Sequence, residues 1–149
     1  MGQDRVDMDT SVGYLLKEAS SVLRAAMEEA LRPFGMTVTH YACLELLAQR
    51  PGLSSSDLAR GAFVTRQSMN VLLKALEQEG HVVRPPEDAV GRVLPTRLTP
   101  LGRQRLAEAS AAVRSVEKRM LAGLSDGDQA QAYRFLQQMV TSLREPTPR

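Results

Sequence analysis

Apolar side chains recur every three or four residues along four stretches of the chain, and this spacing predicts four amphipathic helices. All four of these stretches begin with Ser or Thr, whose hydroxyl can accept a hydrogen bond from an unpaired amide of the first turn. Pro or Gly follows the end of three of them, as is typical of helix ends. The predicted helices cover residues 11–32, 37–50, 99–123 and 125–143.

Between the second and third of these helices lie two shorter ones. Ser54 is the expected N-cap of the first, and we expect Gly61 to end it in the left-handed backbone conformation that glycine adopts without steric cost. The second starts at Thr65 and stops at Gly80. Its buried stripe is predicted to be Met69, Leu72, Leu73 and Leu76.

A β-hairpin is predicted after Gly80. Residues 81–84 and 92–98 are short strand-like runs that flank a turn rich in Pro and Gly. Pro95 indicates an edge strand, because proline cannot donate to a strand ladder. The order short helix, turn, longer helix and hairpin predicts a wing beside a helix-turn-helix, with Arg92 near the tip of the wing.

The polar face of the helix that begins at Thr65 carries basic and amide side chains and no carboxylate until Glu77. The acids sit at the C-terminal end, at Glu77 and Glu79, where the helix dipole disfavours negative charge. An acid-free N-terminal half suits a helix whose end approaches phosphates and base edges. Each feature alone also fits an ordinary solvated face, but their order favours duplex DNA binding.

The composition leaves few other classes open. A length of 149 residues suits one domain with a proper core, and no apolar run approaches the length that spans a bilayer. The polar N-terminus and the single cysteine indicate a cytoplasmic protein. The net charge of +2 is too small to indicate nucleic-acid binding by itself. The prediction of DNA binding therefore depends on where the charged residues lie. We find no Gly-rich phosphate loop or nucleophile elbow, and we expect no enzyme.

The terminal helices carry more apolar surface than so small a domain needs. Either the first helix crosses the whole domain or part of it meets a second chain. We expect one domain of residues 1–149. Within it, residues 11–33 and 99–143 would form a dimerisation layer, and residues 37–98 would form the DNA-binding part, which we call the reader. A two-fold dimer would place two recognition helices ~34 Å apart, which is one turn of DNA.

Two strings make the chain resemble a known family. They are Leu-Glu-x-x-Gly-x-Val-x-Arg at residues 76–84 and Leu-Thr-x-x-Gly at residues 98–102. Together with residues 58–60, 64–70 and 91–94, they resemble the MarR family of bacterial transcription regulators. The resemblance implies a mainly α fold with a small β-hairpin, a winged helix-turn-helix homodimer whose N- and C-terminal helices pair. It also implies that residues 65–74 lie in a major groove and that Arg92 enters the adjacent minor groove.

Roles for the DNA-facing side chains follow from their donors and acceptors. Gln67 and Asn70 suit paired hydrogen bonds to adenine, and Arg66 suits guanine or a phosphate. We expect the phosphate contacts from Thr65, Ser68 and Lys74, and a narrow A/T-rich minor groove suits Arg92. Arg97 either contacts phosphate or pairs with an acid of the hairpin.

The resemblance further implies a repressor of a pseudo-palindromic operator, relieved by a small lipophilic or phenolic effector. Tyr14, His40 and Tyr41 are the candidate effector residues, with ordinary packing as the alternative. A dimeric scaffold that binds acidic proteins is the competing hypothesis. A redox sensor through Cys43 is a third, but a buried inert thiol is favoured because Cys43 follows an apolar face.

The two histidines, His40 and His81, are far apart in the sequence, and no Cys/His cluster surrounds either of them. We therefore expect no metal site and no cofactor.

Overall fold

The computed structural model describes residues 5–84 and 96–147. In this part of the chain six α-helices, a short 3₁₀ helix and a two-stranded antiparallel sheet follow one another. The elements are α1 (Val12–Leu31), η1 (Arg32–Phe34), α2 (Val38–Gln49), α3 (Ser55–Gly61), α4 (Arg66–Gln78), β1 (Val82–Val83), β2 (Arg97–Leu98), α5 (Pro100–Leu121) and α6 (Asp126–Arg144). The expected mainly helical fold with a small hairpin is confirmed.

Each α-helix begins at a hydroxyl side chain that caps it. The N-caps accept a hydrogen bond from the amide three residues on, and they are Ser11, Thr37, Ser54, Thr65, Thr99 and Ser125. At Ser54 the cap is reciprocal, because the carboxylate of Asp57 also accepts from the Ser54 amide. The helix starts predicted from the sequence are therefore correct to within a residue.

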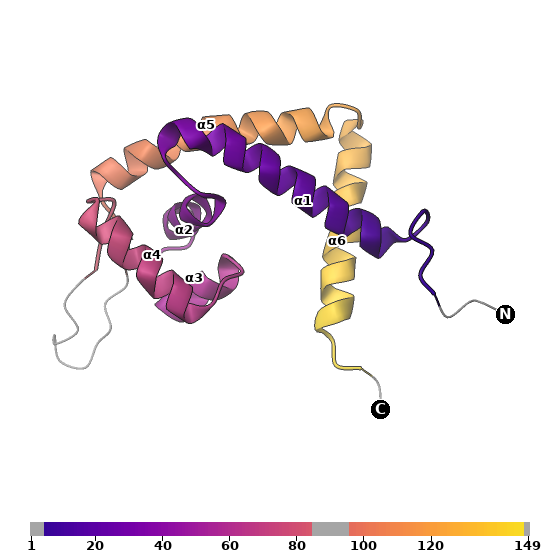
Figure 1. The fold of residues 1–149 in the computed structure, drawn as a ribbon, viewed down its shortest axis with the longest axis horizontal. Helices are drawn as coiled ribbons and strands as arrows, with labels where there is room; N and C mark the ends of the chain where they lie inside the picture. Colours follow the sequence, from indigo (N-terminus) through magenta and orange to yellow (C-terminus); the bar gives the residue numbers. More distant parts are fainter. Residues whose placement is uncertain (1–4, 85–95, 148–149) are drawn as a thin grey trace.

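The elements form a compact end and an open end (Figure 1). Helices α2, α3 and α4 gather with the hairpin, while α1 and α5 pack on each other and extend away from that group. Helix α6 leaves the far end of α5 at a sharp angle. Helices α1 and α5 thus join this group at one end, through Leu31 of α1 and Leu106 and Ala109 of α5, and leave it at the other.

The hydrophobic core lies in the compact end. Its largest fully buried side chains come from α1, α2, α3, α4 and β1: Leu31, Cys43, Leu44, Leu58, Met69, Leu73, Leu76 and Val82. Leu106 and Ala109 of α5 complete it. Three of the four residues predicted for the buried stripe of α4 are completely buried, and Leu72 is partly buried.

The end of α3 differs from the expectation for Gly61. Helix α3 ends at Gly61 as expected, but Gly61 does not adopt the left-handed conformation. The left-handed residue is Phe63, with φ of 60°. Gly61 is small for a different reason, since a Cβ there would approach Leu46 Cδ1 to 2.9 Å. Gly61 therefore allows α3 to pack closely on α2, and its role does not depend on its backbone conformation.

The hairpin is paired where the structure describes it. Val82 faces Leu98 and Val83 faces Arg97 across antiparallel strands. The predictions for Arg92 and Pro95 fall outside the described residues. None of the helices in the described part of the chain combines the length and the apolar character that crossing a bilayer requires.

Candidate nucleic-acid interface

Helix α4 buries most of its apolar side chains and exposes its polar ones, and Val71, 67% exposed, is the exception. Met69, Leu73 and Leu76 are completely buried against the core, which fixes the rotation of the helix about its axis. The opposite face is exposed to solvent. It carries the predicted DNA-facing residues Thr65, Arg66, Gln67, Ser68, Asn70 and Lys74. The structure therefore brings six of the eight predicted DNA-binding residues onto one accessible face.

The first turn of α4 is held by two hydroxyl groups. Thr65 Oγ1 accepts from the Ser68 amide at 3.1 Å and donates to Ser68 Oγ at 2.9 Å. No acidic residue lies in this turn. The N-terminal end thus presents hydroxyls, Arg66 and the positive end of the helix dipole, a combination that favours a phosphate.

Phe63, in the turn between α3 and α4, is a feature that the sequence analysis missed. The Phe63 amide donates to Arg60 O, and the Val64 amide donates to Ala59 O. These two hydrogen bonds form a Schellman motif, in which Phe63 takes the position where glycine is usual. Its side chain is 86% exposed. A bulky residue in the left-handed region is strained. Because the exposed ring lies directly before the first turn of α4, it can contact the same binding partner as that turn. No pattern in the sequence singles it out, because the left-handed position was expected at Gly61.

Arg97 projects from the exposed side of β2, beside the base of the hairpin. It also lines a cavity of about 470 Å³ with two further arginines, Arg103 and Arg114 of α5. Leu47, Leu98 and Leu106 supply apolar walls. A pocket of this size with an apolar wall and several guanidinium groups is suited to a small aromatic ring that carries a carboxylate.

The three candidate effector residues do not converge within one chain. Tyr14 is exposed on α1, and His40 and Tyr41 line different hollows of the surface. The Tyr41 hydroxyl donates to Ser110 Oγ at 3.4 Å, and burial raises the pKa of Tyr41. Their assignment to an effector remains a prediction.

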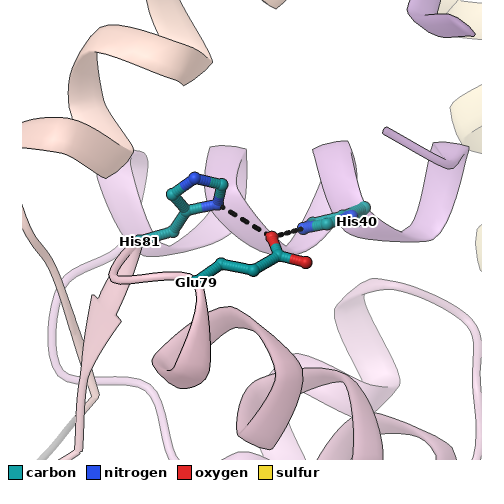
Figure 2. Close-up of side chains that lie close together, drawn as sticks. All are labelled: His40, Glu79 and His81. Carbon is teal, nitrogen blue, oxygen red and sulfur yellow. Dashed lines mark ion pairs between the residues drawn. The ribbon is translucent and has the colours of Figure 1, made fainter. Parts of the chain in front are cut away.

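His40 and His81 lie side by side, contrary to the expectation that no ligand cluster surrounds either. Figure 2 shows both rings turned toward the carboxylate of Glu79, with His40 Nε2 at 3.9 Å and His81 Nδ1 at 3.4 Å from Glu79 Oε2. Burial lowers the pKa of His40, against the raising effect of Glu79. The sequence reasoning erred because 41 positions separate residues that the packing of α2 against the end of α4 brings together. These are side chains that could hold a metal ion.

Cys43 is completely buried in the core, with its thiol 3.7 Å from Met69 Sδ. Burial raises the pKa of the Cys43 thiol to about 12. Since thiolate is the form that reacts with peroxides, this environment favours the inert thiol over the redox sensor.

A short capped helix, a strained turn, a helix with a polar exposed face and a paired hairpin together define a winged helix-turn-helix protein. Residues 34–92 match the sequence profile of the MarR family. The chain is also 44% identical over 131 residues to the HTH-type transcriptional repressor Rv2887 of Mycobacterium tuberculosis, covering 88% of this chain and 94% of that protein. The chain belongs to the MarR family.

Solved structures of Rv2887 are similar to this one. A crystal structure of that protein in complex with DNA has a TM-score of 0.73 at 42% identity and covers 88% of this chain and 98% of that one. A crystal structure of its complex with p-aminosalicylic acid has the same TM-score at 43% identity and covers 87% and 98%.

Proposed function

We propose that the protein is a homodimeric transcriptional repressor that binds a pseudo-palindromic operator in double-stranded DNA. The observation that carries this proposal is the exposed face of α4. From Thr65 to Ala75 this face is free of acid and polar except for Val71, while the other face of the helix is buried in the core. The Rv2887 complex with DNA supports it, since that protein is similar over most of both chains.

On this proposal α4 enters a major groove from its N-terminal end. Gln67 and Asn70 read adenine, and Arg66 reads guanine or holds a phosphate. Thr65, Ser68 and Lys74 contact phosphates, and Arg97 anchors the base of the wing. Phe63 lies next to this surface and supplies an apolar contact, for example to a thymine methyl group or a sugar.

Apolar surface on the terminal helices supports a dimer. Helix α6 has no buried residue, yet one of its faces carries Tyr133, Leu136 and Val140, each at least 46% exposed. Val12, Leu15 and Val22 of α1 are exposed as well. Exposed apolar surface of this extent is costly in water, and a second copy of the chain, related by two-fold symmetry, would cover it. Residues 11–33 and 99–143 would then form the dimer layer and residues 37–98 the reader.

The proposed effector is a small aromatic carboxylate bound in the cavity lined by Arg97, Arg103 and Arg114. The cavity lies between α2, β2 and α5, so it touches both the base of the wing and a helix of the dimer layer. A ligand there relieves repression if it favours a different spacing of the two recognition helices. The Rv2887 complex with p-aminosalicylic acid supports this ligand class.

The protein would act in the cytoplasm, where the DNA is, and would have no catalytic activity. The DNA proposal is tested by selecting bound duplexes from genomic fragments and measuring their affinity by fluorescence anisotropy. We expect a sequence-preferring complex that weakens steeply with salt. Equal affinity for all fragments would contradict the proposal and favour the scaffold that binds acidic proteins.

The effector proposal is tested by titrating the DNA complex with p-aminosalicylic acid. We expect the compound to release DNA from the wild-type protein. Arg114→Gln should weaken this response, and Arg119→Gln, on the same helix but outside the cavity, should not. An identical response from both variants would place the effector elsewhere.

A further inference from the structure

Three potential metal ligands from separate elements meet beside the end of α4. His40 lies in the first turn of α2, Glu79 is the C-cap of α4, and His81 immediately precedes β1. The ligand atoms all lie within 4.8 Å of one another. Figure 2 shows that the carboxylate of Glu79 sits between the two rings.

The backbone holds two of these residues in place. Gly80, with φ of 80°, turns the chain between Glu79 and His81, and the His81 amide bonds Leu76 O at 2.9 Å. The His81 carbonyl in turn accepts from the Thr99 amide at 3.0 Å. Glu79 and His81 are therefore fixed by the end of α4 and the start of α5, so little order has to be created when a ligand arrives.

The two ring nitrogens that face Glu79 are buried and have no hydrogen-bond partner. The side chain of His40 is 11% exposed and that of His81 is 12% exposed, whereas Glu79 is half exposed. A buried nitrogen without a partner is costly, and such atoms are uncommon in folded proteins. A metal ion between the rings would satisfy both nitrogens at once.

The position of the Glu79 carboxylate at the end of α4 also favours a bound cation. A carboxylate at a helix C-cap opposes the helix dipole, so Glu79 is unfavourable for the stability of α4 alone. A divalent cation at that position interacts favourably with both the dipole and the carboxylate. A bound cation would thus offset the unfavourable position of the Glu79 carboxylate at the C-cap of α4.

We propose that His40 Nε2, His81 Nδ1 and a carboxylate oxygen of Glu79 bind one first-row divalent cation, of which Zn²⁺ is the best match. Two imidazoles and one carboxylate are a frequent protein ligand set for zinc, with a fourth position left open. Ligand atoms about 2.1 Å from a tetrahedral Zn²⁺ lie roughly 3.4 Å apart. The separations of 3.4 and 3.9 Å from Glu79 Oε2 to the two ring nitrogens are close to this value, and all three ligand atoms lie within 4.8 Å of one another.

His40, Glu79 and His81 line a hollow of about 330 Å³, whose wall also includes Phe34, Met36, Leu101 and Arg105. The guanidinium of Arg105 opposes a cation there, but Glu108, 3.8 Å away from it, offsets part of its charge. Arg105 also favours an anion or hydroxide as the fourth ligand. The site therefore combines a metal with room for a small exogenous ligand.

The proposal is tested on the metal-free full-length protein by competition between the protein and a chromophoric chelator for Zn²⁺. We expect one Zn²⁺ per chain and no comparable binding of Mg²⁺ or Ca²⁺, which prefer oxygen ligands. Glu79→Gln should weaken binding at least ~10-fold, since even loss of an outer-shell partner costs that much. Glu77→Gln removes the same charge two residues earlier on α4, outside the cluster, and should bind like the wild type.

Imidazole NMR gives a second readout that does not depend on affinity alone. The chain contains only two histidines, and one equivalent of Zn²⁺ should shift the ring resonances of both together. Zn²⁺ should also raise the Tm of the wild type and of Glu77→Gln but not of Glu79→Gln. His81→Gln should behave like Glu79→Gln.

The proposal is overturned if binding is not stoichiometric, if Glu79→Gln and Glu77→Gln bind equally, or if only one histidine responds. Glu79 is exposed and lies outside the core, so the comparison does not depend on whether a histidine variant folds. All these measurements are made without DNA, and their failure would leave the proposed repressor function intact.

Discussion

Helices α4 and α6 are both amphipathic, but the protein treats their apolar faces in opposite ways. Helix α4 buries Met69, Leu73 and Leu76 completely and turns polar residues to solvent. Helix α6 buries no residue, and Leu143 remains 89% exposed. Both helices have an apolar face in the sequence, but only the face of α4 is buried by other elements of the same chain. The apolar face of α4 is thus buried within one chain, whereas that of α6 is left for the second chain of the proposed dimer.

Leu136→Lys on α6 tests this comparison with the largest expected effect. In the proposed dimer the lysine ammonium would be buried without a partner, which costs about 3–5 kcal/mol. We expect the dimer dissociation constant to rise on the order of 100-fold or more, measured by sedimentation, with a parallel loss of operator affinity. Gln138→Lys, an exposed change on the same helix, is the control. An unchanged dimer in Leu136→Lys would mean that α6 lies outside the interface.

The second test addresses the reader's own core. Leu73→Ala should lower the free energy of unfolding by about 2–4 kcal/mol, because it leaves a cavity under α4. Val71→Ala, two residues earlier but 67% exposed, should change it by less than about 0.5 kcal/mol. Chemical denaturation measures both. Similar losses in the two variants would show that α4 is rotated differently about its axis.

Asn70→Ala tests the exposed face of α4. We expect a loss of about 1–3 kcal/mol in discrimination at one base-pair position of each half-site. Affinities for duplexes substituted singly at each position measure it. Gln78→Ala, at the exposed C-terminal end of the same helix, should leave the preference intact. A uniform weakening on all duplexes would reassign Asn70 to the phosphate backbone.

Lys74→Gln should have a smaller effect. If Lys74 contacts a phosphate, its neutralisation lowers the slope of log affinity against log salt by about one and leaves sequence preference alone. Lys118→Gln, on α5 and away from the reader, is the matched control. A changed base preference would instead make Lys74 a base-reading residue.

The smallest expected effect concerns Cys43. Because burial raises the pKa of its thiol to about 12, the native protein should keep it protonated at neutral pH. Alkylation should be slow until the pH rises toward that value or the protein unfolds, and peroxide should not change operator affinity. Denatured protein, which exposes the thiol, provides the positive control. A peroxide response lost in Cys43→Ala would revive the redox hypothesis.

Much of the fold follows from local patterns in the sequence. Ser54 and Thr65 cap the helices that they were predicted to cap, and Gly80 ends α4 in the left-handed conformation. The rotation of α4 follows from the spacing of its apolar residues. These features depend on interactions between residues three or four positions apart, so the order of residues is enough to predict them.

The exceptions involve contacts between distant segments. Gly61 was assigned a backbone role, but what requires its small size is Leu46 on another helix. Arg97, Arg103 and Arg114 share a cavity because β2 and α5 meet α2 there. Tyr14, His40 and Tyr41 do not come together, because Tyr14 is exposed on α1 and the neighbours His40 and Tyr41 line different hollows.

The sequence by itself determined which segments are helical, where they begin and which face of α4 stays polar, because caps and apolar spacing act locally. The tertiary structure was needed to show that His40, Glu79 and His81 converge, that Phe63 takes the strained position before α4, and that α6 buries none of its residues. Those features depend on how elements far apart in the chain pack together, and packing is a property of the assembled shape that no local pattern encodes.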